Sequence, residues 1–130
     1  MIILDKVNYC YSEDSAYRIQ ALKDINLKIV EKLKSFLKAE GIEVVLTRDG
    51  DYSLCSESDQ NKKNTDMKNR MDIIKKNNPV LVVSIHQNSY SDSSIKGAQV
   101  FYYTDSEISK GAATPMQEEL RKIDSENTRQ

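Results

Sequence analysis

The chain has 130 residues, and its 19 Lys and Arg almost balance its 20 Asp and Glu. This length predicts one domain, residues 1–130, with a modest hydrophobic core. A formal net charge of −1 argues against nucleic acid or an anionic membrane as a partner, and no apolar stretch is long enough to span a bilayer.

The first 40 residues predict a strand, a loop and a helix. Residues 1–4 are apolar and start a buried strand, but they are too few for the apolar part of a signal peptide. Residues 6–20 have no clear period, and we expect a loop there. From Asp24 onward an amphipathic helix is indicated, which Gly41 ends in a left-handed conformation. Its recurring apolar residues are Ile25, Ile29, Leu33, Phe36 and Leu37.

The middle of the chain predicts a strand on each side of a loop and a helix. Residues 42–47 and 80–85 are short apolar runs of the kind that form buried strands. Residues 49–64 are polar and without period, which is typical of a long functional or mobile loop. Thr65 is expected to cap a second helix, in which Arg70 directs its charged head toward a cleft or toward water.

The last part of the chain predicts one more strand and one more helix. Residues 97–103 form the strand candidate, and Thr114 is expected to cap a helix whose first residue is a proline. The alternation of strands and helices predicts an α/β fold, with a mainly parallel or mixed sheet flanked by helices. Cys10 and Cys55 form no CxxC pair, so two thiols or one bridge are both open.

The only histidine, His86, directly follows the apolar run 80–85 and precedes two amide side chains. The carboxyl ends of strands in an open α/β sheet are where ligands bind. His86 is therefore a candidate metal ligand, and Gln87 and Asn88 are candidates for a substrate cleft. The alternative is that all three are structural, with the imidazole packed or hydrogen-bonded and the amides bonded to loop backbone.

Several segments, taken in order, resemble the zinc-dependent N-acetylmuramoyl-L-alanine amidase family, in particular its spore-cortex type. The matching stretches are 23–27, 44–49, 69–70, 84–89 and 97–103, and the segments 117–121 and 127–129 also fit. The resemblance implies an amidase-like domain that is incomplete at the C-terminus and lacks the final family strand. One edge of the sheet is then open to a protein partner or to self-association.

This family resemblance also implies a reaction and a place of action. These enzymes cleave the amide between N-acetylmuramic acid and the L-alanine of the stem peptide in peptidoglycan, outside the cytoplasm or in the spore envelope. They hold zinc with two histidines and one glutamate, and a further glutamate moves the proton. The implied cofactor is therefore zinc, and the implied ligand is peptidoglycan or a muramyl peptide.

The family's zinc site maps only partly onto this chain. His86 matches the last zinc histidine, whereas Asn8 stands at the position of the first histidine and Leu22 at that of the zinc glutamate. Leucine has no donor atom, and zinc seldom uses an asparagine carbonyl. No residue of this chain maps to the catalytic glutamate.

Three residues on the loop between the two substituted positions are possible compensating ligands: Cys10, Glu13 and Asp14. The alternative is that they face solvent, as acids in polar loops usually do. We therefore expect an amidase-family domain with weak or no hydrolysis by this chain alone. The alternative function is a catalytically dead amidase-like module for binding or regulation, and whether the chain is an enzyme stays open.

Overall fold

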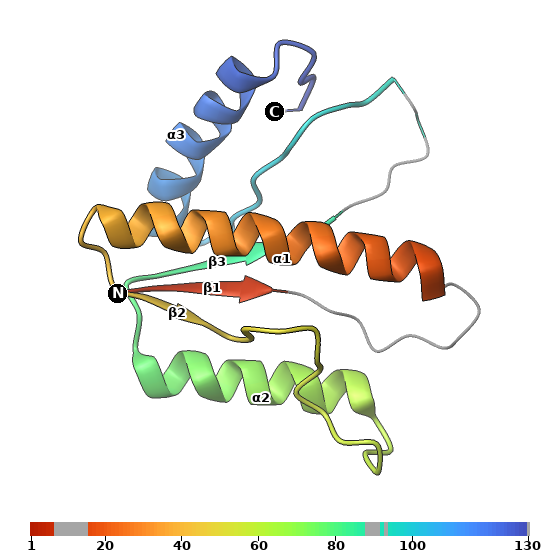
Figure 1. The fold of residues 1–130 in the computed structure, drawn as a ribbon. Helices are drawn as coiled ribbons and strands as arrows, with labels where there is room; N and C mark the ends of the chain where they lie inside the picture. The colour runs from red at the N-terminus through yellow and green to blue at the C-terminus, as the bar shows by residue number, and fades with distance from the viewer. Residues whose placement is uncertain (7–15, 88–91, 93, 130) are drawn as a thin grey trace. The chain divides into compact units, whose positions relative to one another are not determined.

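A computed structural model of the chain describes residues 1–6, 16–87, 92 and 94–129 (Figure 1). For residues 6 and 16–22 it describes the backbone alone. The chain divides into two compact units, Met1–Gln87 and Asn88–Gln130. The expectation of one domain over residues 1–130 stays a prediction. Among the described residues, no helix has the length and apolar character needed to cross a membrane.

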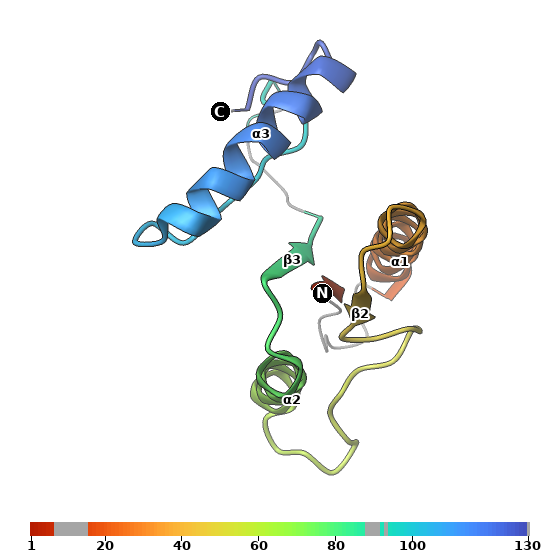
Figure 2. The ribbon, with the colours of Figure 1, turned by 90° about the vertical axis from the view of Figure 1, so that its left-hand side faces the viewer.

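The first unit contains a three-stranded parallel sheet. Strand β1 (Ile2–Lys6) lies between β2 (Val44–Leu46) and β3 (Leu81–Ile85). Helices α1 (Ala16–Ala39) and α2 (Lys62–Asn77) lie on opposite faces of the sheet (Figure 2). With the third helix, α3 (Glu107–Ile123), in the second unit, the predicted α/β fold with a parallel sheet flanked by helices is confirmed.

The hydrophobic core lies between the sheet and α1. Its buried members are Leu4, Val30 and Val44, one from each of β1, α1 and β2. Half-buried apolar side chains surround them: Ile2, Leu33, Leu37, Ile42, Leu46, Val83 and Ile85. Because side chains alternate across a strand, Ile2 and Leu4 face α1 while Ile3 and Asp5 face the side of α2.

Two expectations about burial were wrong. On α1 Leu33 and Leu37 pack against the core beside Val30 as expected, whereas Ile25, Ile29 and Phe36 are exposed. In β3 the burial alternates, and Val80 just before it is 78% exposed. Among the described strands β3 is at the edge of the sheet, and side chains alternate across it, so that Val83 and Ile85 pack against the core under α1 while Val82 and Ser84 face the other way.

The helix boundaries agree with the sequence analysis at one end of α1 and differ at the other. Gly41 has a φ of 75°, and the amides of Gly41 and Ile42 bond to the carbonyls of Lys38 and Leu37 at 3.0 and 2.9 Å. This is the expected left-handed cap, in the Schellman arrangement. The helix begins at Ala16, however, so the loop expected over residues 6–20 was wrong from residue 16 onward.

The other two helices begin earlier than expected because other residues cap them. The side chain of Asn61, not of Thr65, accepts the amide of Asn64 and starts α2. The side chain of Ser106, not of Thr114, starts α3, and Pro115 lies inside that helix. Both true caps are Asn or Ser residues, which serve as well as Thr in this role.

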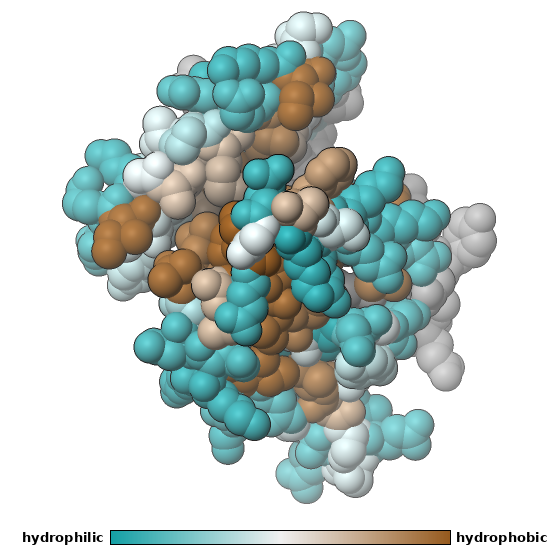
Figure 3. Space-filling model, turned by 60° about the vertical axis from the view of Figure 1, so that its left-hand side comes forward, coloured by the Kyte–Doolittle hydropathy of each residue, from teal (hydrophilic) through white to brown (hydrophobic). Residues whose placement is uncertain are grey.

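The second unit contains α3 and an irregular segment along it. Residues 97–103 form no strand, contrary to expectation. The amide of Val100 instead donates to the side chain of Gln117 at 2.8 Å, and the carbonyl of Ala98 accepts from Gln117 and Asn127. Side-chain amides thus take the place of a neighbouring strand. Apolar side chains remain exposed on both units, and Figure 3 shows some of this brown surface between teal polar groups.

Candidate functional site

A buried carboxylate, Asp5, joins the ends of all three strands at their common edge, which we call the carboxyl edge. Its Oδ1 accepts a hydrogen bond from Thr47 just after β2 at 2.7 Å, and its Oδ2 accepts one from Ser84 of β3 at 2.7 Å. The guanidinium of Arg70 on α2 lies 2.9 Å from the same Oδ2. Asp5 therefore ties the sheet to α2 through three donors.

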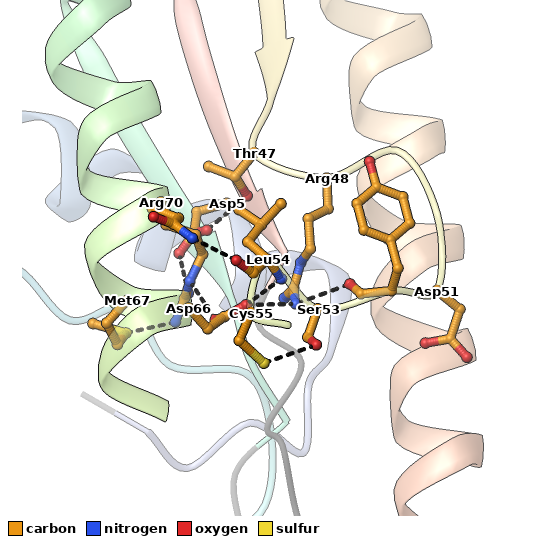
Figure 4. A network of polar contacts seen from close by, with 12 residues as sticks. Asp5, Thr47, Arg48, Asp51, Ser53, Leu54, Cys55, Asp66, Met67 and Arg70 are labelled. Atoms are coloured by element: carbon orange, nitrogen blue, oxygen red, sulfur yellow. Dashed lines mark hydrogen bonds and ion pairs between the residues drawn. The ribbon is translucent and has the colours of Figure 1, made fainter. Parts of the chain in front are cut away.

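A second carboxylate, Asp66, extends this network along α2. Its Oδ2 lies 3.0 Å from Nε of Arg70, and its Oδ1 lies 3.4 Å from an Nη of Arg48. All of these side chains are buried, and Figure 4 shows them pointing toward one another. We call Asp5, Arg48, Asp66 and Arg70 the ion network. Its two formal positive charges balance its two negative ones, as buried charges require.

The ion network also holds the loop that follows β2. The amide of Leu54 donates to Asp66 at 2.8 Å, and its carbonyl accepts from the side chain of Asn69. Arg48 donates to the carbonyl of Tyr52 at 3.2 Å. The long polar loop predicted at this place is thus anchored to α2 at its centre. Because the anchors are buried charged and amide groups, the loop has a defined conformation.

The sequence analysis missed this network. No local pattern marks Arg48, yet it is only 1% exposed and pairs with Asp66. The sequence analysis left Arg70 between a cleft and water, whereas Arg70 bonds to two buried carboxylates. The only local signal was the spacing of Asp66 and Arg70, because residues four apart on a helix can form an ion pair.

His86 directly follows β3 at the carboxyl edge, and its pKa is lowered from the ordinary value of 6.5. Partial burial of the ring is the main cause, the Asp5 carboxylate opposes it, and the Arg70 guanidinium adds to it. The imidazole is therefore mainly neutral at pH 7. A neutral imidazole has one nitrogen that donates and one lone pair that can accept a hydrogen bond or bind a metal.

The donors around His86 do not fit a zinc site within the part of the chain that the structure describes. No group there of three or more His, Cys, Asp or Glu side chains is arranged to hold a metal ion. The nearby carboxylate of Asp5 already accepts from three protein donors, one of them cationic. A zinc site with three protein ligands therefore cannot be assembled from the described residues.

The structure describes only some of the remaining candidate residues. Gln87 donates to the side chain of Asn26 on α1 at 3.1 Å, so it links the end of β3 to that helix. The backbone of Leu22 lies in α1. The other candidates, Asn8, Cys10, Glu13, Asp14 and Asn88, lie outside the described residues. The roles assigned to all of them stay predictions.

Comparisons with known proteins agree with the resemblance in the sequence. Residues 16–130 match the family model of N-acetylmuramoyl-L-alanine amidase. A germination-specific N-acetylmuramoyl-L-alanine amidase of Bacillus subtilis (strain 168) is 30% identical over 103 residues, which are 77% of this chain and 44% of that protein. The chain thus spans less than half the length of that curated relative.

A solved structure is also similar. It is the CwlD amidase from Clostridioides difficile in complex with the GerS lipoprotein, and the TM-score is 0.81 at 36% sequence identity. The match covers 99% of this chain and 69% of that one. The similarity therefore extends over both units of the chain described above.

Proposed function

Because this chain belongs to the N-acetylmuramoyl-L-alanine amidase family, we propose that it binds the muramyl peptide of peptidoglycan and, alone, hydrolyses it weakly or not at all. The family match and the similar solved structure support an amidase-like domain. The proposal separates recognition of the substrate from its cleavage, because these two steps need different groups at the carboxyl edge.

We expect weak hydrolysis mainly because both oxygens of the Asp5 carboxylate already accept hydrogen bonds from protein groups. The carboxylate that would be available beside His86 accepts from Thr47, Ser84 and Arg70. In this family zinc, when bound, polarises the scissile carbonyl and activates water. We place Asn8 and Leu22 at the positions of two zinc ligands, and neither is an ordinary zinc donor. His86 alone then supports only weak metal binding.

Recognition of a muramyl peptide needs hydrogen-bonding groups rather than a metal. A neutral imidazole such as that of His86 has one donor and one acceptor nitrogen, and the next residue along the chain, Gln87, donates to the side chain of Asn26. Amide groups of this kind match the lactyl amide and the peptide bonds of the ligand. These residues support binding without any proton transfer.

A protein partner is the second proposal. The similar CwlD amidase is described in complex with a lipoprotein. In this chain β3 is an edge strand of the sheet formed by the described residues. The open backbone groups of an edge strand can pair with another chain, so either a partner protein or a second copy is a candidate occupant.

Two measurements on metal-free protein test the proposal. Calorimetric zinc titration of the wild type and of His86→Ala is expected to show no stoichiometric binding that depends on His86. Incubation with purified peptidoglycan is expected to retain the protein on the polymer without release of stem peptides. Stoichiometric micromolar binding that is lost in His86→Ala would contradict the inactive interpretation, and Cys10, Glu13 and Asp14 would then be mutated in turn. Failure to bind peptidoglycan would contradict the proposed binding of the muramyl peptide.

A further inference from the structure

The anchored loop after β2 presents an aromatic ring to solvent. Tyr52 is 49% exposed, although it follows the buried Arg48 by only four residues. A tyrosine side chain combines an apolar face with a polar tip, and such rings are enriched where proteins bind other molecules. A single exposed tyrosine needs no explanation by itself, so the argument depends on how this ring is held.

The ring of Tyr52 is held at both of its ends. Its hydroxyl donates to Oδ1 of Asp49 at 2.5 Å, which lowers the pKa of that carboxyl and raises the pKa of the phenol. Its backbone carbonyl accepts from the buried guanidinium of Arg48 at 3.2 Å. The tip and the base of the residue are thus both fixed, and the phenol stays neutral.

Glycine at position 50 is part of the same arrangement. A Cβ atom on Gly50 would lie 3.0 and 3.1 Å from two carbons of the Tyr52 ring, closer than ordinary packing. The backbone of Gly50 therefore runs directly along the ring. An alanine at position 50 would require the ring to shift by a few tenths of an ångström, because a Cβ contact at this distance is tighter than ordinary packing.

The loop that carries Tyr52 leaves the sheet at its carboxyl edge, directly after β2. Asp51 lies 3.7 Å from Lys23 on α1, and Leu54 is bonded to Asp66 on α2. The segment between these two anchors contains Tyr52. The carboxyl edge also carries His86, and in open α/β sheets ligands bind outside this edge. The loop that carries this fixed ring therefore begins at the edge where we place the proposed ligand.

A ring that is fixed before binding loses little conformational freedom when a ligand arrives. Its apolar face suits the C–H surface of a pyranose, and the carboxylate of Asp49 beside it accepts hydrogen bonds from sugar hydroxyls. A stem peptide has no such flat, hydroxyl-bordered surface. The combination of ring and carboxylate thus matches the sugar of peptidoglycan better than its peptide.

We propose that Tyr52, held by Asp49, Gly50 and Arg48, is the platform on which an amino-sugar ring of the glycan strand stacks. This inference rests on the proposed recognition of muramyl peptides and assigns the sugar to the loop after β2. It makes Tyr52 a specificity-determining residue that takes no part in any proton transfer or metal binding.

The test uses N-acetylmuramoyl-L-alanyl-D-isoglutamine as the probe, and the dipeptide without sugar as its partner. Saturation-transfer NMR and a titration are recorded for the wild type, Tyr52→Ala, Tyr52→Phe and Gly50→Ala. Tyr103→Ala is the control, because Tyr103 is a 73% exposed tyrosine that belongs to the second unit. Urea unfolding of each variant verifies that it is folded.

We expect Tyr52→Ala to weaken binding of the muramyl dipeptide about three- to tenfold, the range of one aromatic contact. Tyr52→Phe keeps the ring and loses less, Gly50→Ala displaces the ring and falls between the two, and Tyr103→Ala binds as the wild type does. Equal binding by wild type and Tyr52→Ala would overturn this inference and leave the proposed function intact. Equal binding of the dipeptide without sugar would overturn it too. No binding by the wild type would overturn the proposed function and this inference together.

Discussion

Two irregular segments of this protein are held in place by side chains instead of a neighbouring strand, and they differ in burial. The loop after β2 is anchored through Arg48 and Asp66, which are 1% and 2% exposed. The segment along α3 is anchored through amide groups of Gln117 and Asn127, in bonds that are exposed or half-buried. Buried charged groups, together with the amide of Asn69, hold the first segment, and neutral amides hold the second.

The difference predicts how each segment responds when an anchor is lost. A buried ion that loses its partner has no water to replace it, so the cost is large. An exposed amide that loses its partner bonds to water, and the cost is small. The proposed sugar platform, Tyr52, lies on the loop after β2, which is the segment with the buried charged anchors. A fixed conformation there reduces the conformational freedom lost on binding.

The largest effect is expected for Asp66→Asn. The substitution leaves Arg48 and Arg70 without the charge that both approach, at 3.4 and 3.0 Å. The free energy of unfolding should fall by about 3–5 kcal/mol, measured by urea denaturation. The control is Glu119→Gln, which removes an exposed pair with Lys122 and should leave the urea midpoint unchanged. Equal midpoints for both variants would mean that the buried network does not stabilise the first unit.

A smaller effect is expected for Gly97→Ala in the second unit. Gly97 has a φ of 96°, and an added Cβ would collide with the side chain of Asn127. The left-handed conformation of a non-glycine residue costs about 1–2 kcal/mol, and Asn127 must also leave Ala98. The control is Gly111→Ala, where no atom lies within 4 Å of the new Cβ and α3 should gain stability. Hydrogen exchange of the α3 amides measures both variants.

A still smaller effect is expected for Gln117→Ala, which removes one of the side-chain amides that hold the segment along α3. Gln117→Ala removes the donor to Ala98 and the acceptor for Val100. The cost should be about 1 kcal/mol, because water replaces part of what is lost. Hydrogen exchange at Val100 should become faster, while the amide of Leu54 in the first unit keeps its protection. Unchanged exchange at Val100 would show that its bond to Gln117 contributes nothing.

The smallest effect concerns pH. His86 has a pKa below 6.5 in the folded protein, so the unfolded chain binds more protons at mildly acidic pH. Its contribution to stability is therefore fully present above pH 6.5 and is lost as the pH falls toward the folded pKa. Because the chain has one histidine, the imidazole NMR signal of metal-free protein reports this pKa directly. In His86→Gln this part of the pH dependence should disappear, and a measured pKa above 6.5 would contradict the assignment.

The site was predictable only where its signal is local. His86 was found because it is the only histidine and follows an apolar run, and these features are visible in a few neighbouring residues. The contact of Asp5 with Arg70 joins residues 65 positions apart, and that of Arg48 with Asp66 joins residues 18 apart. No periodicity marks such pairs. A sequence pattern indicates which residues are charged, but not which charges will be buried together.

The sequence by itself determined the order of strands and helices in the first unit but not where its helices begin, and it determined the left-handed end of α1 at Gly41 and the amidase family. These depend on short-range spacing, on a backbone conformation that suits glycine, and on several motifs that follow one another in the order expected for the family. Only the tertiary structure decided that the segment at 97–103 forms no strand, that Ser106 starts α3, and that Arg48 is buried. Those outcomes depend on partners brought together by folding, because a backbone amide or a guanidinium goes to the best acceptor within reach in space.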